Sequence, residues 1–429
     1  MKEKFIKGTI ILIIGGLLTK ILGMVIKIIT TRIVGINAIG LYSLVMPTYG
    51  LLITIATLSL PIAISKLVAE NTRKNKNIVL GIIPIAMLFN VILILVTITM
   101  AKPLANGLLQ NKDLYYPLIA ISITLPFITL SNILRGYFFG KEQMIPHVVS
   151  NLTEQIIRIG ITILITPHLL KYGIVSTVTG LILFNIISEL TSIIVLVLFM
   201  PRNSKIRKQD IKPVKDNVKD ILNISIPTTA GRIISGVGNF LEPVIITYVL
   251  LKLGYDTNYV TKEYGIITGL ILPLVTLPQF ISAAIAQALL PTLSKYNAQN
   301  MKKAINRKLK QALLISLVIG IISSLILMIF PKESLYMMFK TEDGYKYLVL
   351  GAITFLITYV EAPIVSTLQA LDKAKTIMKA NLIGTIIKTI TLFVLLYLDI
   401  SMYALLISIL LQHTYITIIE YKKIKETLS

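Results

Sequence analysis

The sequence predicts an all-α, polytopic membrane protein in which about twelve transmembrane helices form two six-helix lobes. Charged residues make up 14% and hydrophobic residues 55% of its 429 positions, whereas roughly a quarter of a soluble domain is charged. Apolar runs such as 78–100 and 311–331 are long enough to cross a hydrocarbon core of about 30 Å as helices. These observations exclude a water-soluble fold.

Apolar runs separated by loop signals place six spans in each half of the chain. In the first half the spans are expected at 8–33, 39–65, 78–100, 114–134, 147–167 and 174–199. In the second half they are expected at 220–251, 264–292, 311–331, 345–365, 376–398 and 401–420. The two lobes are therefore expected at 1–200 and 220–429, joined by a basic linker at 201–219.

The first apolar run is predicted to be a retained transmembrane helix and not a cleaved signal. Lys20 and Lys27 interrupt the run, and no small-residue cleavage site ends a short apolar core. The N-terminus of the sequence is therefore interpreted as the start of the first lobe.

The basic residues of the loops predict the orientation. Most of the 42 Lys and Arg residues fall in the two terminal segments and in alternate loops, including Arg135 and the linker 201–219. Because short cytoplasmic loops collect Lys and Arg, both termini and the linker are expected in the cytoplasm. The formal charge of +22 is thus explained by topology, and no nucleic-acid partner is expected.

The even number of spans in each half predicts a parallel repeat. Both halves would begin on the cytoplasmic side, so they would be related by an axis along the membrane normal. Two such bundles can rock about a central cavity and expose it alternately to the two sides of the membrane.

Basic residues inside the first and seventh spans are candidates for an anion site. A charge at bilayer depth costs about 2.5–3.5 kcal/mol on insertion scales, so it usually faces a bundle interior or a cavity. The candidates are Lys20, Lys27, Arg32 and Arg232. Lys20 lies twelve residues after Gly8, roughly 18 Å along a helix, and Arg232 lies equally far after Asp220. The alternative is that these cations only neutralise acids such as Glu154 or Glu242.

Four further intramembrane charges are interpreted as ion-pair or coupling candidates: Glu154, Arg158, Glu242 and Lys388. Glu154 and Arg158 are spaced i, i+4 with the acid first, which favours a helical ion pair. A self-neutralised pair of this kind lets a helix insert without binding a ligand. Glu189 and Glu361 could be packing contacts, coupling-ion sites or interfacial residues, and the sequence does not choose among these.

No residue pattern indicates an enzyme. The chain has no cysteine, its three histidines lie near expected span ends without metal-ligand spacing, and no catalytic or nucleotide-binding motif is evident. We therefore expect no catalytic residue, metal or cofactor. A coupling ion (Na+ or H+) or the membrane potential is the expected energy source.

Several motifs resemble the stage V sporulation protein B family of polysaccharide biosynthesis proteins. In the first half these are Lys20-Ile21-Leu22-Gly23, Thr31-Arg32-Ile33-Val34-Gly35 and Leu60-Pro61-Ile62-Ala63-Ile64-Ser65-Lys66. In the second half they are Ile224-Ser225-Ile226-Pro227, Gly231-Arg232, Leu277-Pro278 and Leu290-Pro291. The family belongs to the multidrug/oligosaccharidyl-lipid/polysaccharide (MOP) exporter superfamily and is similar to the MurJ-type lipid II flippases, which often carry two further helices.

The resemblance implies a MATE-like fold in the bacterial cytoplasmic membrane and transport of an undecaprenyl-diphosphate-linked saccharide, a cell-wall or polysaccharide precursor. It further implies that Lys20, Lys27, Arg32 and Arg232 hold the diphosphate while two lobes alternate access. Membrane lipids and cell-wall synthesis proteins are the other expected partners. A third hypothesis is a non-transporting scaffold that recruits cell-wall enzymes through its cytoplasmic loops. The main alternative is an ion-coupled multidrug-type exporter, and a net positive charge inside the membrane favours the anionic substrate.

Overall fold

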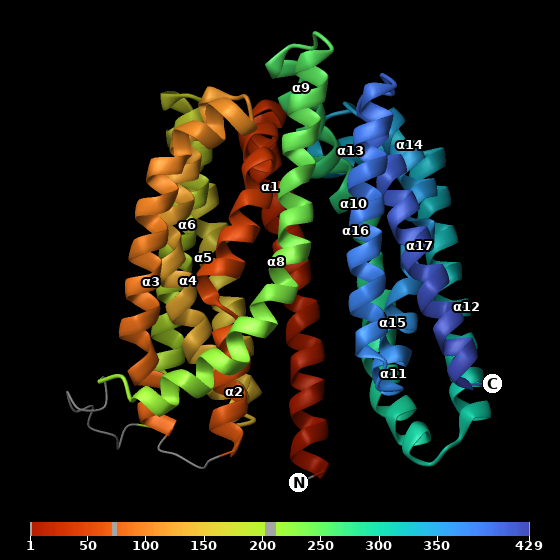
Figure 1. The fold of residues 1–429 in the computed structure, drawn as a ribbon. Coiled ribbons are helices and arrows are strands. Elements are labelled where there is room, and N and C mark those ends of the chain that lie inside the picture. Colours follow the sequence, from red (N-terminus) through yellow and green to blue (C-terminus); the bar gives the residue numbers. More distant parts are fainter. Residues whose placement is uncertain (1, 71–74, 202–211, 429) are drawn as a thin grey trace. The chain divides into compact units, whose positions relative to one another are not determined.

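The computed structural model describes residues 2–70, 75–201 and 212–428, with side chains from residue 11 onward, and contains only helices and their connections in these ranges. The contacts divide the chain into two compact units, Met1–Phe240 and Leu241–Ser429. Figure 1 shows each unit as a bundle of long helices. The all-α membrane fold expected from the sequence is confirmed.

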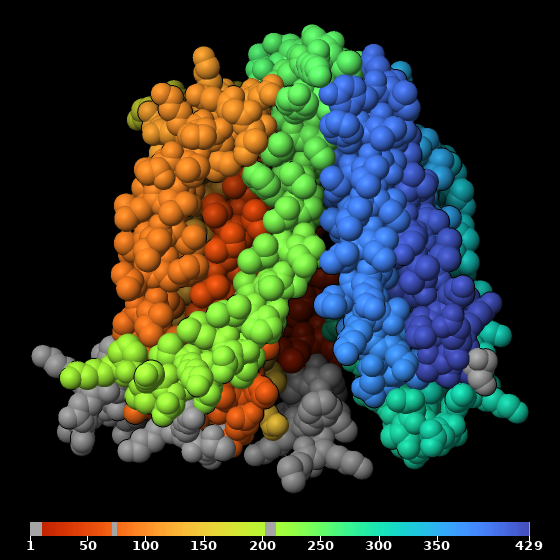
Figure 2. Space-filling model, in the orientation of Figure 1, coloured from red at the N-terminus to blue at the C-terminus, as the bar shows by residue number. Residues whose placement is uncertain are grey.

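In its described residues the N-terminal unit, residues 1–240, contains the six helices α1 to α6, three short η elements and most of α8. In chain order the elements are α1 (Lys2–Thr57), α2 (Leu60–Glu70), α3 (Asn75–Pro103), η1 (Leu104–Leu108), η2 (Lys112–Leu114), α4 (Tyr115–Gly140), α5 (Met144–Leu169), η3 (Leu170–Tyr172), α6 (Ile174–Leu198) and α8 (Lys215–Lys252) as far as Phe240. On one face of this unit, side chains of α1 are visible between α3 and the first part of α8 (Figure 2).

The C-terminal unit, residues 241–429, takes the rest of α8 and the remaining helices. These are α9 (Thr257–Gly265), η4 (Ile266–Ile271), α10 (Leu272–Thr276), α11 (Gln279–Ala298), α12 (Lys302–Ile329), α13 (Pro331–Phe339), α14 (Tyr345–Thr354), η5 (Phe355–Val360), α15 (Glu361–Ala370), α16 (Ala374–Tyr397) and α17 (Tyr403–Leu428). α16 and α17 lie side by side on one face of this unit (Figures 1 and 2).

Ten helical segments of the described ranges are long and apolar enough to cross a membrane, or eleven when the bent pair 257–276 and 279–298 counts as one span. The first segment, Ile11–Glu70, is 60 residues long, whereas about 20 residues suffice for one crossing. Gly35 interrupts it with a non-helical backbone (φ 76°, ψ 176°). The segment is therefore long enough to hold both spans expected at 8–33 and 39–65. Counting it as two crossings raises the eleven spans to about twelve.

A second break separates α1 from α2 at Leu58 and Ser59. Both residues have left-handed backbone conformations, with φ of 45° and 49°, which non-glycine residues adopt only at a cost. Pro61 follows in the first turn of α2, where its missing N–H costs no helical hydrogen bond. The Leu60-Pro61 motif thus begins a new helix inside the apolar segment 39–65.

Close contact between α2 and α4 depends on two glycines. A Cβ atom at Gly136 would lie 2.9 Å from Pro61, and one at Gly140 would lie 2.6 Å from the carbonyl oxygen of Ser65. Small residues allow membrane helices to approach this closely, which increases their packing energy. The contact fixes the end of α4 and, with it, the position of Arg135.

In the C-terminal unit a glycine has the same function between α16 and α17. A Cβ atom at Gly384 would lie 2.8 Å from Ile416. Lys388 follows Gly384 by one helical turn and therefore lies on the same face of α16. The close packing directs the Lys388 side chain into the unit, where it is buried.

The region of the expected linker is partly helical in the structure. Residues 202–211 of the expected linker 201–219 lie outside the described residues. α8 already begins at Lys215, so the last residues of that linker are helical. Ile221 of α8 is buried in the core of the N-terminal unit, and Arg232 belongs to this unit and not to the second. The division into functional lobes at 201–219 stays a prediction.

Candidate functional site

The predicted anion-site residues of the first span lie along α1. Lys20 and Arg32 are exposed and Lys27 is half-buried. Lys20 and Lys27 are seven residues apart, nearly two helical turns, and therefore share one side of the helix. Within the described part of the chain, Lys20 makes no ion pair.

Arg232 of α8 lies against the break between α1 and α2. Its Nη1 atom donates a hydrogen bond of 3.5 Å to the hydroxyl of Ser59, and the Arg232 side chain remains exposed. Ser59 itself is fully buried. No acid forms an ion pair with Arg232 among the described residues. The guanidinium therefore keeps most of its hydrogen-bonding capacity.

Glu154 of α5 is held by two arginines inside the N-terminal unit. Its Oε1 atom lies 2.7 Å from Arg158, the partner expected one turn away. Its Oε2 atom lies 2.7 Å from Arg135 of α4. The Glu154 side chain is only 9% exposed, so both of its oxygens are occupied in a buried site.

Arg135 lies within α4 and not in a loop. The prediction that it belongs to a cytoplasmic loop is wrong, because α4 continues to Gly140 and the Arg135 side chain is 12% exposed. Arg135 also donates to Ser192 at 2.9 Å and lies 3.6 Å from Glu189. The span expected at 114–134 ends one residue before Arg135, so the sequence does not place Arg135 among the intramembrane charges.

The two arginines and the two acids form one charge cluster across α4, α5 and α6. Ser188 accepts a hydrogen bond of 3.2 Å from Arg158. With two guanidinium groups and two carboxylates, the cluster is neutral when all four are charged. Glu189, whose role the sequence does not decide, therefore belongs to this buried network.

Glu242 and Lys388 form the corresponding buried pair of the C-terminal unit. Their charged atoms lie 2.8 Å apart, and the side chains are 12% and 6% exposed. The hydroxyl of Tyr264 donates to the other oxygen of Glu242 at 2.9 Å. The sequence names both charged residues but does not pair them, and it gives no signal for Tyr264.

The ion pairs described above leave a surplus of positive charge at Lys20 and Arg232. Glu154 and Glu189 contact Arg135 and Arg158, and Glu242 contacts Lys388. These acids are thus occupied by other basic residues, and neither Lys20 nor Arg232 forms an ion pair with them. An anion is the ligand that such cations can bind in an apolar span. No group of three His, Asp or Glu side chains in the described ranges has the arrangement of a metal site.

Comparison with known proteins adds family relationships to this geometry. A family model described as "Polysaccharide biosynthesis protein" matches residues 5–297, and one described as MatE matches residues 267–394. Stage V sporulation protein B of Bacillus subtilis (strain 168) is 36% identical over 92% of this chain and 78% of its own length. Lipid II flippase MurJ of the same organism is 24% identical over 91% of this chain and 77% of its own.

Solved structures with low sequence identity share the fold. An inward-facing MATE family transporter of the MOP superfamily aligns with a TM-score of 0.72 at 14% identity, covering 96% of this chain and 94% of that chain. Lipid II flippase MurJ in an inward closed conformation aligns with a TM-score of 0.70 at 15% identity, covering 96% and 87%. The expected MATE-like fold is thereby confirmed.

Proposed function

The chain belongs to the polysaccharide biosynthesis protein family, and from this membership we propose that it is an alternating-access flippase for an undecaprenyl-diphosphate-linked saccharide. Its coarser class, a multi-pass membrane protein of the transporters and flippases of the MOP superfamily, follows from the family and the fold. The proposal concerns the substrate, a lipid II-like precursor of the cell wall or of a polysaccharide.

The surplus of positive charge inside apolar spans is the observation that carries the proposed substrate class. Lys20 and Arg232 form no ion pair with an acid in the described part of the chain, whereas Glu154 and Glu242 are both occupied by other basic residues. An uncompensated charge at this depth is expensive and usually functional. A diphosphate is an anion that would neutralise two cations placed within apolar spans.

Arg232 and Lys20 would bind the diphosphate differently. The planar guanidinium of Arg232 can donate two parallel hydrogen bonds to phosphate oxygens, while the ammonium of Lys20 acts as a point charge. Lys27 and Arg32 would extend the same positive surface along α1. Movement of the two lobes would then carry the bound headgroup across the membrane, while the lipid tail stays in the bilayer.

A multidrug-type exporter is the second candidate, because a MatE family model matches 267–394 and a MATE transporter shares the fold. Cationic drugs need an available acid. In the described part of the N-terminal unit, Glu154 already contacts two arginines and Glu189 lies 3.6 Å from one of them. The charge balance of the described part of the N-terminal unit, where Lys20 and Arg232 lie, therefore favours the anionic substrate.

The proposal is tested by reconstituting the full chain in liposomes. The liposomes would contain either an undecaprenyl-diphosphate-linked saccharide or a cationic dye. Translocation is followed by the accessibility of the saccharide headgroup to an impermeant reagent. We expect the wild type to move the lipid-linked saccharide, and Arg232→Gln to slow this movement about tenfold or more, since one charge-assisted hydrogen bond contributes about 1.5–3 kcal/mol.

Lys252→Gln is the matched control, because Lys252 ends the same helix and is exposed. This variant should transport at the wild-type rate. Transport of the dye without transport of the saccharide would replace the proposed function by the multidrug reading. Wild-type flipping by a well-inserted Arg232→Gln variant would remove Arg232 from the site.

A further inference from the structure

A cluster of polar side chains between α15 and α17 has no part in the proposed transport site. Nδ1 of His413 lies 2.7 Å from Oε1 of Glu361, and the hydroxyl of Thr417 donates to the same oxygen at 3.3 Å. The Glu361 and His413 side chains are 20% and 26% exposed. His413 lies in the middle of α17 and not near its end, contrary to the expectation from the sequence.

Glu420 continues this cluster by one helical turn. Residues 413, 417 and 420 are spaced four and three positions apart, so they lie on one face of α17. Glu420 is completely buried, and neither of its carboxylate oxygens has a hydrogen-bond partner in the described ranges. Glu361 is hydrogen-bonded to residues 413 and 417 of this face, so its carboxylate lies on the same side of α17 as Glu420. Two acids thus share one site, and only Glu361 is hydrogen-bonded.

No neighbouring cation compensates Glu420 in the part of the chain that the structure describes. The buried titratable groups on the helices packed against α17 are bonded elsewhere: Lys388 to Glu242, Tyr347 to Glu263 and Tyr359 to the carbonyl oxygen of Val275. The other basic residues of α12, α14 and α16 are exposed, among them Lys310, Lys375 and Lys379. An isolated carboxylate in an apolar interior is very costly, and the group then takes up a proton instead. The surroundings of Glu420 therefore favour its neutral form.

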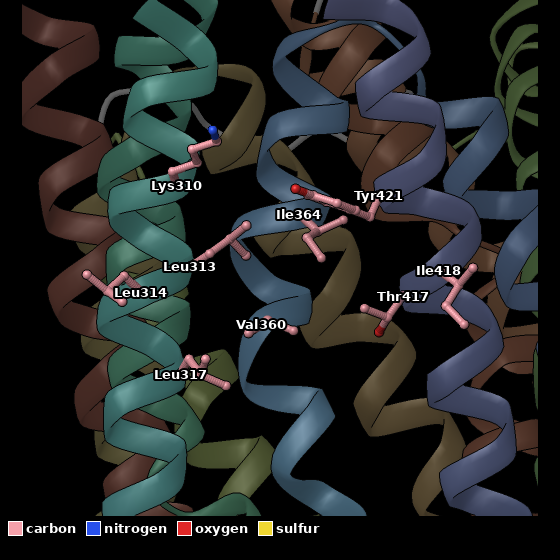
Figure 3. A pocket seen from close by; sticks show the side chains of 9 residues that line it. All are labelled: Lys310, Leu313, Leu314, Leu317, Val360, Ile364, Thr417, Ile418 and Tyr421. Atoms are coloured by element: carbon pink, nitrogen blue, oxygen red, sulfur yellow. The ribbon is translucent and has the colours of Figure 1, made fainter.

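An open groove of about 430 Å³ gives access to the cluster. Leucine and isoleucine side chains of α12, α15 and α17 line most of it, together with Lys310, Thr417 and Tyr421 (Figure 3). Since Thr417 both lines the groove and donates to Glu361, the groove reaches the hydrogen-bonded side chains of the cluster.

From this geometry we propose that Glu361, His413 and Glu420 form a proton-binding site in which Glu420 takes up and releases the proton. Uptake forms an O–H bond on one Glu420 oxygen with a proton from water, and a single negative charge then remains on Glu361. His413, with its proton on Nδ1, and Thr417 both donate to that charge. Release restores two neighbouring carboxylates, which repel each other, so it requires a rearrangement that hydrates Glu420.

Proton release of this kind would couple a proton gradient to movement of α15 and α17. That coupling rests on the proposed transport function, whereas the proton site does not. An acid inside a membrane span commonly marks a proton relay. The two statements are therefore tested by separate measurements.

The proton site is tested by infrared difference spectroscopy of the purified full chain between mildly acidic and mildly alkaline pH. We expect a carbonyl stretch of a neutral carboxylic acid that disappears as the pH rises. The band should be absent in Glu420→Gln and shifted, but present, in Glu420→Asp. Glu426→Gln is the matched control, because Glu426 lies in the same helix with its side chain 50% exposed, and this variant should keep the band.

Two outcomes would overturn the site. One is a Glu420→Gln spectrum that superimposes on the wild-type spectrum. The other is a band that responds to Na+ at constant pH and not to pH, which would make the cluster a sodium site. The Asp variant keeps the test valid if the Gln variant fails to fold.

Coupling is tested by imposing a pH gradient on liposomes that contain the lipid-linked saccharide. The wild-type rate should depend on the gradient and the Glu420→Gln rate should not. If no protein moves the saccharide while the infrared band titrates as expected, the proposed function fails and the proton site stands. If all variants transport the saccharide with equal gradient dependence, Glu420 has no coupling role.

Discussion

The ammonium of Lys388 lies 2.8 Å from a carboxylate oxygen of Glu242, and the two residues are 146 positions apart in the chain. Both side chains are buried, and Tyr264 donates to the second oxygen of Glu242. This pair ties α8 to α16 within the C-terminal unit. Glu242, which the sequence offers as a possible partner for the cations of the proposed anion site, thus already has a basic partner in its own unit.

Replacing only Lys388 should destabilise the protein more than replacing both residues of the pair. Lys388→Met alone leaves a buried, uncompensated Glu242, at a cost of about 3 kcal/mol or more, while a double change with Glu242→Gln restores neutrality. We expect a lower unfolding temperature for the single variant and substantial recovery for the double variant, measured on purified protein. A double variant as unstable as the single would argue against this pairing.

Arg135 should be more important for stability than Arg158. Arg135 contacts both Glu154 and Glu189, whereas Arg158 contacts only Glu154 of these two acids. Arg135→Leu should therefore lower membrane abundance and thermal stability more than Arg158→Leu. Equal effects of the two substitutions would contradict the bridging role of Arg135.

Reversal of the Glu154–Arg158 pair should not restore function, although i, i+4 pairs often tolerate it. The arginine introduced at position 154 would face Arg135, which lies 2.7 Å from the native carboxylate. Like charges at this distance repel strongly in a buried site. Membrane abundance and flipping per molecule should both stay low in the double reversal, and recovery of both would show that Arg135 is not close to position 154.

Gly140→Ala should weaken the contact between α2 and α4. The new Cβ atom would lie 2.6 Å from the carbonyl oxygen of Ser65, and overpacking of this kind costs about 1–3 kcal/mol. Gly160→Ala is the matched control, since a Cβ atom there meets nothing within 4 Å. Thermal unfolding of the two variants should show a clear loss for the first alone.

The cytoplasmic orientation of the linker is tested by cysteine labelling. The chain contains no native cysteine, so Lys212→Cys and Lys171→Cys each introduce a single thiol. An impermeant reagent should label the cysteine at 171 in intact cells and leave the cysteine at 212 unlabelled until the membrane is opened. The reverse pattern would invert the expected topology.

Arg232→Lys should impair flipping more than Lys20→Arg. The first change replaces a two-pronged phosphate contact by a point charge, while the second keeps a cation that can form such a contact. Initial rates in liposomes, normalised to the amount of inserted protein, provide the comparison. Equal rates for both variants would mean that neither residue binds the diphosphate in the proposed way.

The sequence by itself determined the membrane character, the approximate positions of the spans and the identity of most intramembrane charges. These features are local, because hydrophobic length is sufficient to define a span and an i, i+4 spacing is sufficient to bring Glu154 and Arg158 together. The break at Gly35, between the spans expected at 8–33 and 39–65, is also local, since glycine adopts a positive φ without strain. The break at Leu58 and Ser59, inside the span expected at 39–65, did not follow from the sequence, because neither residue favours a left-handed backbone.

Only the tertiary structure decided which charges meet across helices. Lys388 finds Glu242 because Gly384 allows α16 to pack closely against α17, and Arg135 finds Glu154 because Gly136 and Gly140 fix the end of α4 against α2. The buried and unpartnered state of Glu420 likewise depends on the helices around α17. Such contacts are set by the packing and rotation of whole helices, which no short window of sequence contains.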